Sequence, residues 1–319
     1  HQPEVWKNTH KYLLLSGYLN YQLTGNYRDS IASQVSYIPF DYKHHRWAKP
    51  SDWKWQIAPI SPNQLPELVK PGDIIGQIQS DAAQSTGLPE GLPVIAAGAD
   101  KPSEVLGSGC FQPNQACLSY GTTATINVTS DKYIEPIRFI PPYPSSIADS
   151  YTLEFQIHRG YWMVSWFKEE FAHAEKLLSQ ERGVATEQIL EESVADIPPG
   201  SDGLMLQPYW SPGVKVPGPE ARGAIIGFKD SHTKAHVYHA ILEGIAYGLR
   251  EGLESIERKT HQKIEQLFVS GGGSQSATSM QLTADIFNLP AIRPHTYETS
   301  AQGAAINAAV GIGIYDSYA

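Results

Sequence analysis

The stretch Phe268-Val-Ser-Gly-Gly-Gly-Ser-Gln-Ser-Ala-Thr-Ser-Met280 is the part of the chain that decides its fold. The apolar run Leu267–Val269 predicts a buried strand, and a helical pattern begins at about Ser276. Glycines carry no side chain, so a flat ligand can lie directly against the backbone where the strand ends. The next helix would turn its amide-rich, positive end toward that ligand. The stretch therefore has the outline of a nucleotide site.

The residues of this run, Gly271, Gly272, Gly273, Ser274 and Gln275, fit no standard phosphate-binding motif. A dinucleotide fingerprint would need a further glycine where Ser276 stands and an acid downstream of a βαβ unit. A P-loop would need Gly-Lys followed by Ser or Thr, and no Gly-Lys pair occurs in the chain. An ordinary flexible turn stays open as the alternative.

Two other patterns resemble parts of a phosphoryl-transfer site. Pro93–Asp100 predicts a strand that leads to an acid at the start of a short helix, Pro102–Gly107. A carboxylate in that place can accept the proton of a hydroxyl that attacks phosphorus, although Asp100 is also a common type of helix N-cap.

The segment Ala116–Val128 predicts two strands around the turn Gly121-Thr122-Thr123. Such a turn can offer backbone amides and two hydroxyls to phosphate oxygens. Gly and Thr are equally ordinary in a simple hairpin turn, so both interpretations stay open.

The composition restricts the class of protein. The chain has 319 residues, 41% of them hydrophobic and 18% charged, which predicts a globular protein of two domains. Its net charge of −9, without a basic cluster, argues against nucleic acid as a partner. Cys110 and Cys117 are the two cysteines, which excludes a disulfide framework and fits the cytoplasm. No apolar run reaches membrane-spanning length and no signal peptide is visible.

Strand and helix patterns alternate along the chain, which predicts an α/β fold with a central sheet that the hairpin makes mixed. The longest helix is predicted from Thr233 to about Lys259, because apolar residues recur there every three or four positions. Residues 35–90 read as short helices and loops with a short strand near Ile74–Ile78. The other predicted helices are 5–23, 161–179, 276–287 and 300–313, and the other predicted strands are 151–158, 203–207, 223–228 and 291–293.

Three histidines, His232, His236 and His239, are close together at the start of the longest helix. The first two could share a face and bind a metal ion, but no third ligand is evident, so we assign no metal site. Trp162 and Trp166 are one helical turn apart, which favours core packing over a shelf for a ligand.

In series, these motifs resemble the FGGY carbohydrate kinases of the actin-like (ribonuclease H-like) ATPase superfamily. The most specific segment is Gly223–Glu243, which is similar to that family's short Gly-x-apolar-x-Gly strand followed by a helix with an acid. Leu23-Thr24-Gly25 upstream and Gly303-Ala304-Ala305 downstream resemble further family segments.

The resemblance implies an actin-like ATPase domain at 110–319 that binds nucleotide. Residues 1–109 would be the C-terminal portion of a preceding, sugar-binding lobe. It also implies roles for single residues: Asp100 as general base, Gly121, Thr122 and Thr123 as a phosphate-binding turn, and Gly271 to Gln275 as the segment that holds adenosine. Gly107 and Gly109 match the small residues that follow the base. The implied reaction transfers the γ-phosphoryl group of ATP to a hydroxyl of a sugar or polyol, with Mg²⁺, in a protein that is a possible homodimer.

One departure from the family keeps other hypotheses open. The family begins with an Asp-x-Gly-Thr hairpin, and nothing like it precedes His1, so we expect a chain truncated at its N-terminus and also at its C-terminus. The alternatives are a non-catalytic actin-like nucleotide-binding module and an inactive fragment of the kinase. A third alternative is an acyl-phosphate-forming kinase, but the segment Gly223–Glu243 argues against it.

Overall fold

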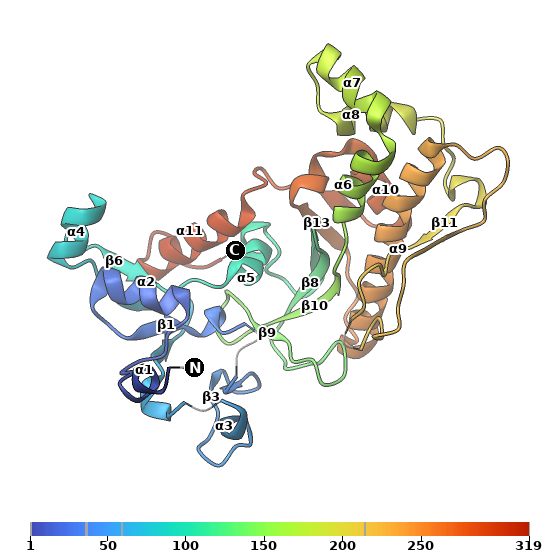
Figure 1. The fold of residues 1–319 in the computed structure, drawn as a ribbon. Coiled ribbons are helices and arrows are strands. Elements are labelled where there is room, and N and C mark those ends of the chain that lie inside the picture. The colour runs from blue at the N-terminus through green and yellow to red at the C-terminus, as the bar shows by residue number, and fades with distance from the viewer. Residues whose placement is uncertain (1, 36–37, 59, 214, 319) are drawn as a thin grey trace.

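The computed structural model describes residues 2–35, 38–58, 60–213 and 215–318. The elements of the first hundred residues lie on one side, and a six-stranded sheet with its helices lies on the other (Figure 1). Helix α5 (Asp100–Gly107) and helix α11 (Thr299–Gly311) pack against each other between these two parts.

The six-stranded sheet is mixed. In spatial order its strands are β14 (Ala291–Ile292), β13 (Gln266–Ser270), β7 (Gln115–Tyr120), β8 (Ala124–Ser130), β10 (Tyr151–Ile157) and β9 (Tyr143–Pro144). β13 runs parallel to both β14 and β7, whereas the pairs β7–β8, β8–β10 and β10–β9 are antiparallel. The predicted hairpin and the mixed character of the sheet are therefore confirmed.

The main core lies between this sheet and α9 (Lys234–Thr260), the helix predicted from Thr233 to about Lys259. Every residue of β8 is buried, as expected for a central strand that is covered on both faces. The apolar stripe of α9 is buried against the sheet, including Ile241, Ile245 and Leu249. All buried residues of this large core come from 116–287.

Helices α6 (Trp162–Phe171), α7 (His173–Arg182), α8 (Thr186–Ser193) and α10 (Ala277–Phe287) complete this part. The prediction of one helix over 161–179 is wrong at one point. Ala172 leaves the helical conformation, at φ −106° and ψ 37°, and is fully buried. The break turns the chain so that α7 packs on α8 as a projection above α6 (Figure 1).

The first part of the chain consists of short elements. They are α1 (Pro3–Lys7), α2 (Leu15–Thr24), β1 (Arg28–Ser30), η1 (Ile31–Ser33), β2 (Phe40–Asp41), β3 (Arg46–Trp47), α3 (Lys54–Ile57), η2 (Pro62–Gln64), β4 (Glu67–Val69), β5 (Ile74–Gln77), α4 (Ser80–Thr86) and β6 (Pro93–Ile95). The short elements predicted for 35–90 are confirmed where the structure describes this range, and residues 36, 37 and 59 lie outside it.

The prediction of one helix over residues 5–23 is wrong, because two helices stand there with an extended segment between them. In that segment the Tyr12 amide donates to Gln64 O at 2.8 Å, and Lys11 Nζ donates to Asn63 O at 2.6 Å. The Tyr12 amide therefore has its partner in a distant segment and not in a helix, and the Lys11 side chain binds the same segment. The predicted end of the helix near residue 23 is confirmed, since α2 ends at Thr24 and Gly25 adopts the left-handed conformation of a C-cap at φ 71°.

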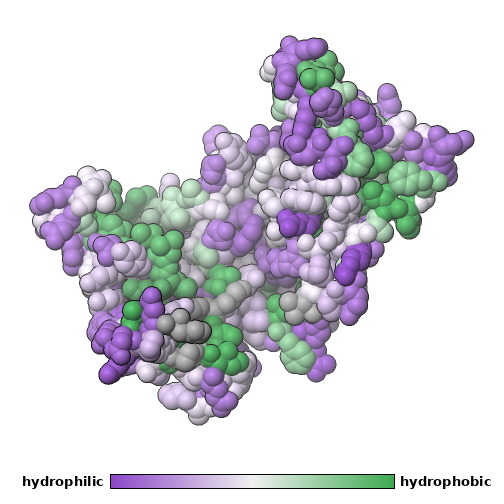
Figure 2. Space-filling view, viewed as in Figure 1, coloured by the Kyte–Doolittle hydropathy of each residue, from purple (hydrophilic) through white to green (hydrophobic). Residues whose placement is uncertain are grey.

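Helix α2 leaves apolar side chains in contact with solvent. Leu15 and Leu19, one turn apart, are 73% and 52% exposed, and hydrophobic surface gathers on the side of the molecule where α2 lies (Figure 2). The first part of the chain therefore has less core of its own than the second. Among the described residues, every helix is too short or too polar to cross a lipid bilayer.

The short strands predicted at 203–207 and 223–228 are present as β11 (Met205–Gln207) and β12 (Ala224–Ile226), which pair with each other in antiparallel orientation. Directly before β11, η3 (Ser201–Gly203) is held to α9 by a buried cluster of hydrogen-bonded side chains. Ser201 Oγ donates to Glu243 Oε2 at 2.7 Å, and Ser201 Oγ and His239 Nδ1 are 2.8 Å apart. Burial opposes ionisation of Glu243, but hydrogen bonds from His239, the Gly200 amide and Ser201 outweigh it and lower the pKa of that carboxyl.

Candidate functional site

Two glycine turns meet at one edge of the central sheet. Strands β7 and β13 are parallel neighbours, and Ser119 pairs with Ser270 at their carboxyl ends. Gly121 follows the first strand and Gly271 follows the second. Because parallel strands end at the same edge, two turns that are far apart in the sequence lie side by side.

A cavity of about 710 Å³ opens between these turns. Five of the residues predicted for the nucleotide lie in its wall: Gly121, Thr122, Gly272, Gly273 and Gln275. Thr123, Gly271 and Ser274 belong to the same turns but are not part of the wall. The structure thus brings together the two turns that the sequence predicts as separate parts of one site.

The glycine run forms a tight 3-10 turn, η4 (Gly272–Gln275), before α10 begins. Gly271 has φ +79°, and a Cβ on Gly273 would lie 2.4 Å from the Tyr161 ring, so side chains are excluded there. Ser274 Oγ donates to Gly271 O at 2.7 Å and holds the turn closed. A Cβ on Gly272 would meet no atom within 4 Å, which leaves its backbone open to the cavity.

The threonine turn is held by the start of α6. The Tyr161 amide donates to Gly121 O at 3.0 Å, and the Trp162 amide donates to Thr122 O at 3.3 Å. Thr123 Oγ1 donates to His158 O at 3.2 Å, so this hydroxyl serves the structure of the turn. The Thr122 side chain is exposed at the cavity.

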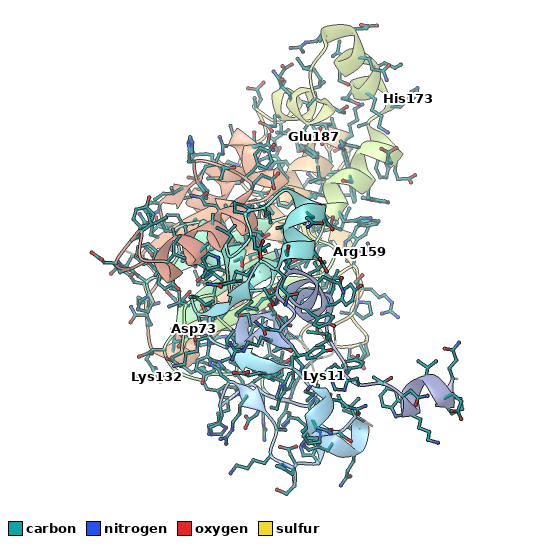
Figure 3. The ribbon with its side chains drawn as sticks, turned by 90° about the vertical axis from the view of Figure 1, so that its left-hand side faces the viewer. Lys11, Asp73, Lys132, Arg159, His173 and Glu187 are labelled. Carbon is teal, nitrogen blue, oxygen red and sulfur yellow. The ribbon has the colours of Figure 1, made fainter. Side chains whose placement is uncertain are left out.

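The rest of the cavity wall includes aromatic and acidic side chains that the sequence analysis did not assign to the site. They are Tyr120, Tyr161, Trp162, Tyr238, Glu187 and Glu191. Trp162 was interpreted as core, and it is half-buried against the core while its other side lines the cavity. The Arg159 guanidinium lies 4.9 Å from the Trp162 ring centre, and Glu187 lies above Arg159 on α8 (Figure 3). In the sequence, the Tyr161-Trp162 pair shortly after the predicted strand 151–158 is the feature that could have indicated this aromatic part of the wall.

Burial keeps the phenols of this wall neutral. It raises the pKa of both Tyr120 and Tyr161 above the usual range, and the Tyr120 hydroxyl is hydrogen-bonded to Thr283. A neutral aromatic floor with carboxylates at the rim can stack a purine and accept hydrogen bonds from hydroxyl or amino groups.

Asp100 is the first residue of α5, two residues earlier than the predicted helix start. Ala99 occupies the N-cap position, so Asp100 does not act as the cap. Its carboxylate is exposed and accepts the Lys101 amide at 2.8 Å, and its backbone carbonyl accepts Ser300 Oγ at 3.1 Å. Asp100 is not in the cavity wall, but its helix is bonded to the strands that lead there.

Two side chains of α5 make these bonds. Lys101 Nζ donates to Ser119 Oγ at 2.8 Å, and Glu104 Oε1 accepts Ser270 Oγ at 2.6 Å. Ser119 and Ser270 are the residues that pair at the ends of β7 and β13. The helix of the candidate base is therefore fixed to both strands from which the turns start.

The three histidines do not come together as a metal site. His236 Nε2 is 3.2 Å from Asp202 Oδ2, whereas His239 faces the buried Ser201. In the part of the chain that the structure describes, no group of three His, Cys, Asp or Glu side chains could hold a metal ion.

Comparison with known proteins gives two family matches that cover most of the chain. Residues 1–107 match the N-terminal domain of the FGGY family of carbohydrate kinases, and residues 116–312 match its C-terminal domain. A protein named "Uncharacterized sugar kinase YgcE" from Escherichia coli (strain K12) is 33% identical over 306 residues, which are 95% of this chain and 61% of that protein. Xylulose kinase from Bacillus subtilis (strain 168) is 30% identical over 321 residues, 99% of this chain and 61% of the relative.

Solved structures agree with these matches. The crystal structure of xylulose kinase from Rhodospirillum rubrum superposes with a TM-score of 0.84 at 26% identity, over 100% of this chain and 62% of that one. Gluconate kinase from Lactobacillus acidophilus gives a TM-score of 0.84 at 21% identity, over 99% of this chain and 62% of that one. The predicted α/β, actin-like ATPase fold is confirmed, and the chain spans about three fifths of the length of these relatives. The chain belongs to the FGGY family of carbohydrate kinases.

Proposed function

We propose that the protein transfers the γ-phosphoryl group of ATP to a hydroxyl of a sugar or polyol, with Asp100 as the general base. The observation that carries this proposal is the joint placement of three predicted parts. The turns at Gly121 and Gly272 face one cavity, and the strands that lead to them are bonded to the helix that begins at Asp100.

Different parts of the cavity wall suit the nucleoside and the triphosphate of ATP. Trp162 and the neutral tyrosines would stack the base, while Glu187 and Glu191 would accept hydrogen bonds from ribose or amino groups. The backbone at Gly121 would lie against the phosphates and the backbone at Gly272 against the adenosine, where a side chain would block close approach. The triphosphate end would then point toward the strand ends and α5.

In the reaction, the Asp100 carboxylate would accept the proton of the substrate hydroxyl as its oxygen attacks the γ-phosphorus. Mg²⁺ would neutralise the phosphate charges. Since no set of three ligating side chains stands in the described residues, phosphate oxygens and water would supply most of its ligands.

The division into a sugar-binding portion at 1–109 and a nucleotide-binding lobe at 110–319 is part of the same proposal. It is supported by the two family matches, which meet between residues 107 and 116. Helix α11 crosses this division, because it comes from the end of the chain and packs on α5.

The test is an assay of ATP consumption by the full-length protein over a panel of sugars, polyols and carboxylates. Relatives of this chain are named xylulose kinase, L-fuculokinase and gluconokinase, so the panel includes xylulose, fuculose, gluconate and glycerol. Phosphorylation of at least one hydroxyl compound is expected. Binding of ATP without any transfer would instead support a non-catalytic nucleotide-binding module.

A further inference from the structure

We propose that Lys101 and Glu104 are positioning residues, which hold the helix of Asp100 in a fixed place relative to both turns of the nucleotide cavity. This inference rests on the proposed kinase function. It assigns to the pair the task of placing the base relative to the phosphate that it helps to transfer.

The first connection runs through Lys101, the residue directly after Asp100. Its ammonium donates to Glu104 Oε2 at 2.6 Å and to Ser119 Oγ at 2.8 Å. Ser119 lies near the end of β7, two residues before Gly121. A single side chain therefore joins the start of α5 to the strand that leads into the threonine turn.

The second connection runs through Glu104. Its Oε1 accepts Ser270 Oγ at 2.6 Å, and Ser270 immediately precedes Gly271. Glu104 is 8% exposed and Ser270 is fully buried, so water does not replace these contacts. Both carboxylate oxygens of Glu104 have a partner, one on its own helix and one on β13.

The energetics of this arrangement favour a fixed geometry. A buried carboxylate is stable only when its oxygens are well bonded, and charge-assisted hydrogen bonds are shorter and stronger than neutral ones. Ser119 and Ser270 are also partners across the β7–β13 ladder. A shift of either strand end would break a bond to α5, so the two turns and the base move as one unit.

The charges around the pair agree with this role. The Lys101 ammonium pairs with Glu104, and these two charges, together with that of Asp100, act on Glu154 of β10. Burial raises the pKa of Glu154 to about 7, helped by the charges of Glu104 and Asp100, while Lys101 and a hydrogen bond from Tyr143 oppose this rise. Removal of the Lys101 ammonium would leave this rise in the pKa of Glu154 less opposed, so that its carboxyl would ionise at higher pH.

The experiment compares Glu104→Gln and Lys101→Met with wild type in the full-length protein, with steady-state kinetics for ATP and for the phosphorylated substrate. A misplacement of the order of 1 Å between reacting groups costs about 10²-fold in rate, so kcat should fall by about 10²-fold in each variant, with the KM for ATP within about threefold of wild type. The double variant should be no slower than the slower single variant, because both changes break one network.

Glu192→Gln is the matched control, since Glu192 pairs with Arg182 at 2.7 and 2.8 Å on the surface of α7 and α8. Its kcat and its KM for ATP should equal those of wild type. A kcat for Glu104→Gln within twofold of wild type, or an equal loss of ATP affinity and of kcat, would overturn the inference.

If Glu104→Gln does not fold, the kinetics of Lys101→Met test the inference instead. The Lys101 side chain is 29% exposed, so its loss leaves the core intact. If the wild-type protein does not transfer phosphate, the proposed function itself is wrong. If the wild-type protein is active and the variants are equally active, only this inference is wrong.

Discussion

Gly107 of α5 and Gly303 of α11 bring the backbones of their helices into direct contact. A Cβ on Gly107 would lie 1.9 Å from Thr299 O, and a Cβ on Gly303 would lie 1.9 Å from Ser103 O. No side chain fits on either residue, so only glycine permits this crossing. The contact fixes the helix that carries Asp100 against an element from the far end of the chain.

The first prediction concerns this crossing. Gly303→Ala should destabilise the protein by about 3 kcal/mol, because the added methyl group would force the two helices apart. Urea unfolding followed by circular dichroism measures the change. Ala305→Ser on the exposed face of the same helix is the control and should change stability by less than about 0.5 kcal/mol. Equal stability of the two variants would contradict the close contact.

The second prediction separates the glycines of the cavity turn. Gly272→Ala should leave stability nearly unchanged, since its Cβ meets no atom within 4 Å, but should weaken ATP binding on the order of tenfold. Gly273→Ala should instead destabilise the fold by about 1–3 kcal/mol, because its Cβ would overlap the Tyr161 ring. Calorimetric titration with ATP and thermal unfolding together measure both effects. Unchanged ATP affinity of Gly272→Ala would place the nucleotide elsewhere.

The third prediction tests the base. Asp100→Asn should lower kcat by about 10²–10⁴-fold, because the amide cannot accept the proton of the attacking hydroxyl. Nucleotide affinity should stay close to that of wild type, since Asp100 is not in the cavity wall. Asp131→Asn, a change at an exposed acid in the turn after β8, is the control. Full turnover by Asp100→Asn would defeat the assignment.

The fourth prediction concerns Glu154. Burial, with the charges of Glu104 and Asp100, raises its pKa from 4.5 to about 7. The folded state therefore holds this proton more tightly than the unfolded state does. The resulting stability is present below about pH 4.5 and is lost as the pH rises to about 7.

Glu154→Gln removes this titration. The variant should gain stability relative to wild type as the pH rises from 4.5 to 7, by at most about 3 kcal/mol. Urea unfolding of both proteins at pH 5 and pH 8 measures the difference. The same difference in stability at the two pH values would show that Glu154 does not titrate in this range.

Local patterns were predictable from the sequence wherever a segment's own residues decide its structure. The stripe of α9, the strand before Gly271 and the hairpin around Gly121 depend on periodicity and on glycine, which act over a few residues. The family resemblance added Gly107 and Gly303 as positions in a known order and implied a role for Asp100. The stripe, the strand and the hairpin are set by short-range sterics and by burial of one face, so the sequence carries them directly.

Contacts between distant segments were decided only by the tertiary structure. The break after Lys7 depends on hydrogen bonds from Lys11 and Tyr12 to a segment some fifty residues away. The acidic rim of the cavity comes from α8, which folds over the turns only because the chain turns at Ala172. The bonds of Lys101 and Glu104 to Ser119 and Ser270 likewise require two strands to pair first. Such contacts depend on the packing of the whole chain, and no local pattern of residues records them.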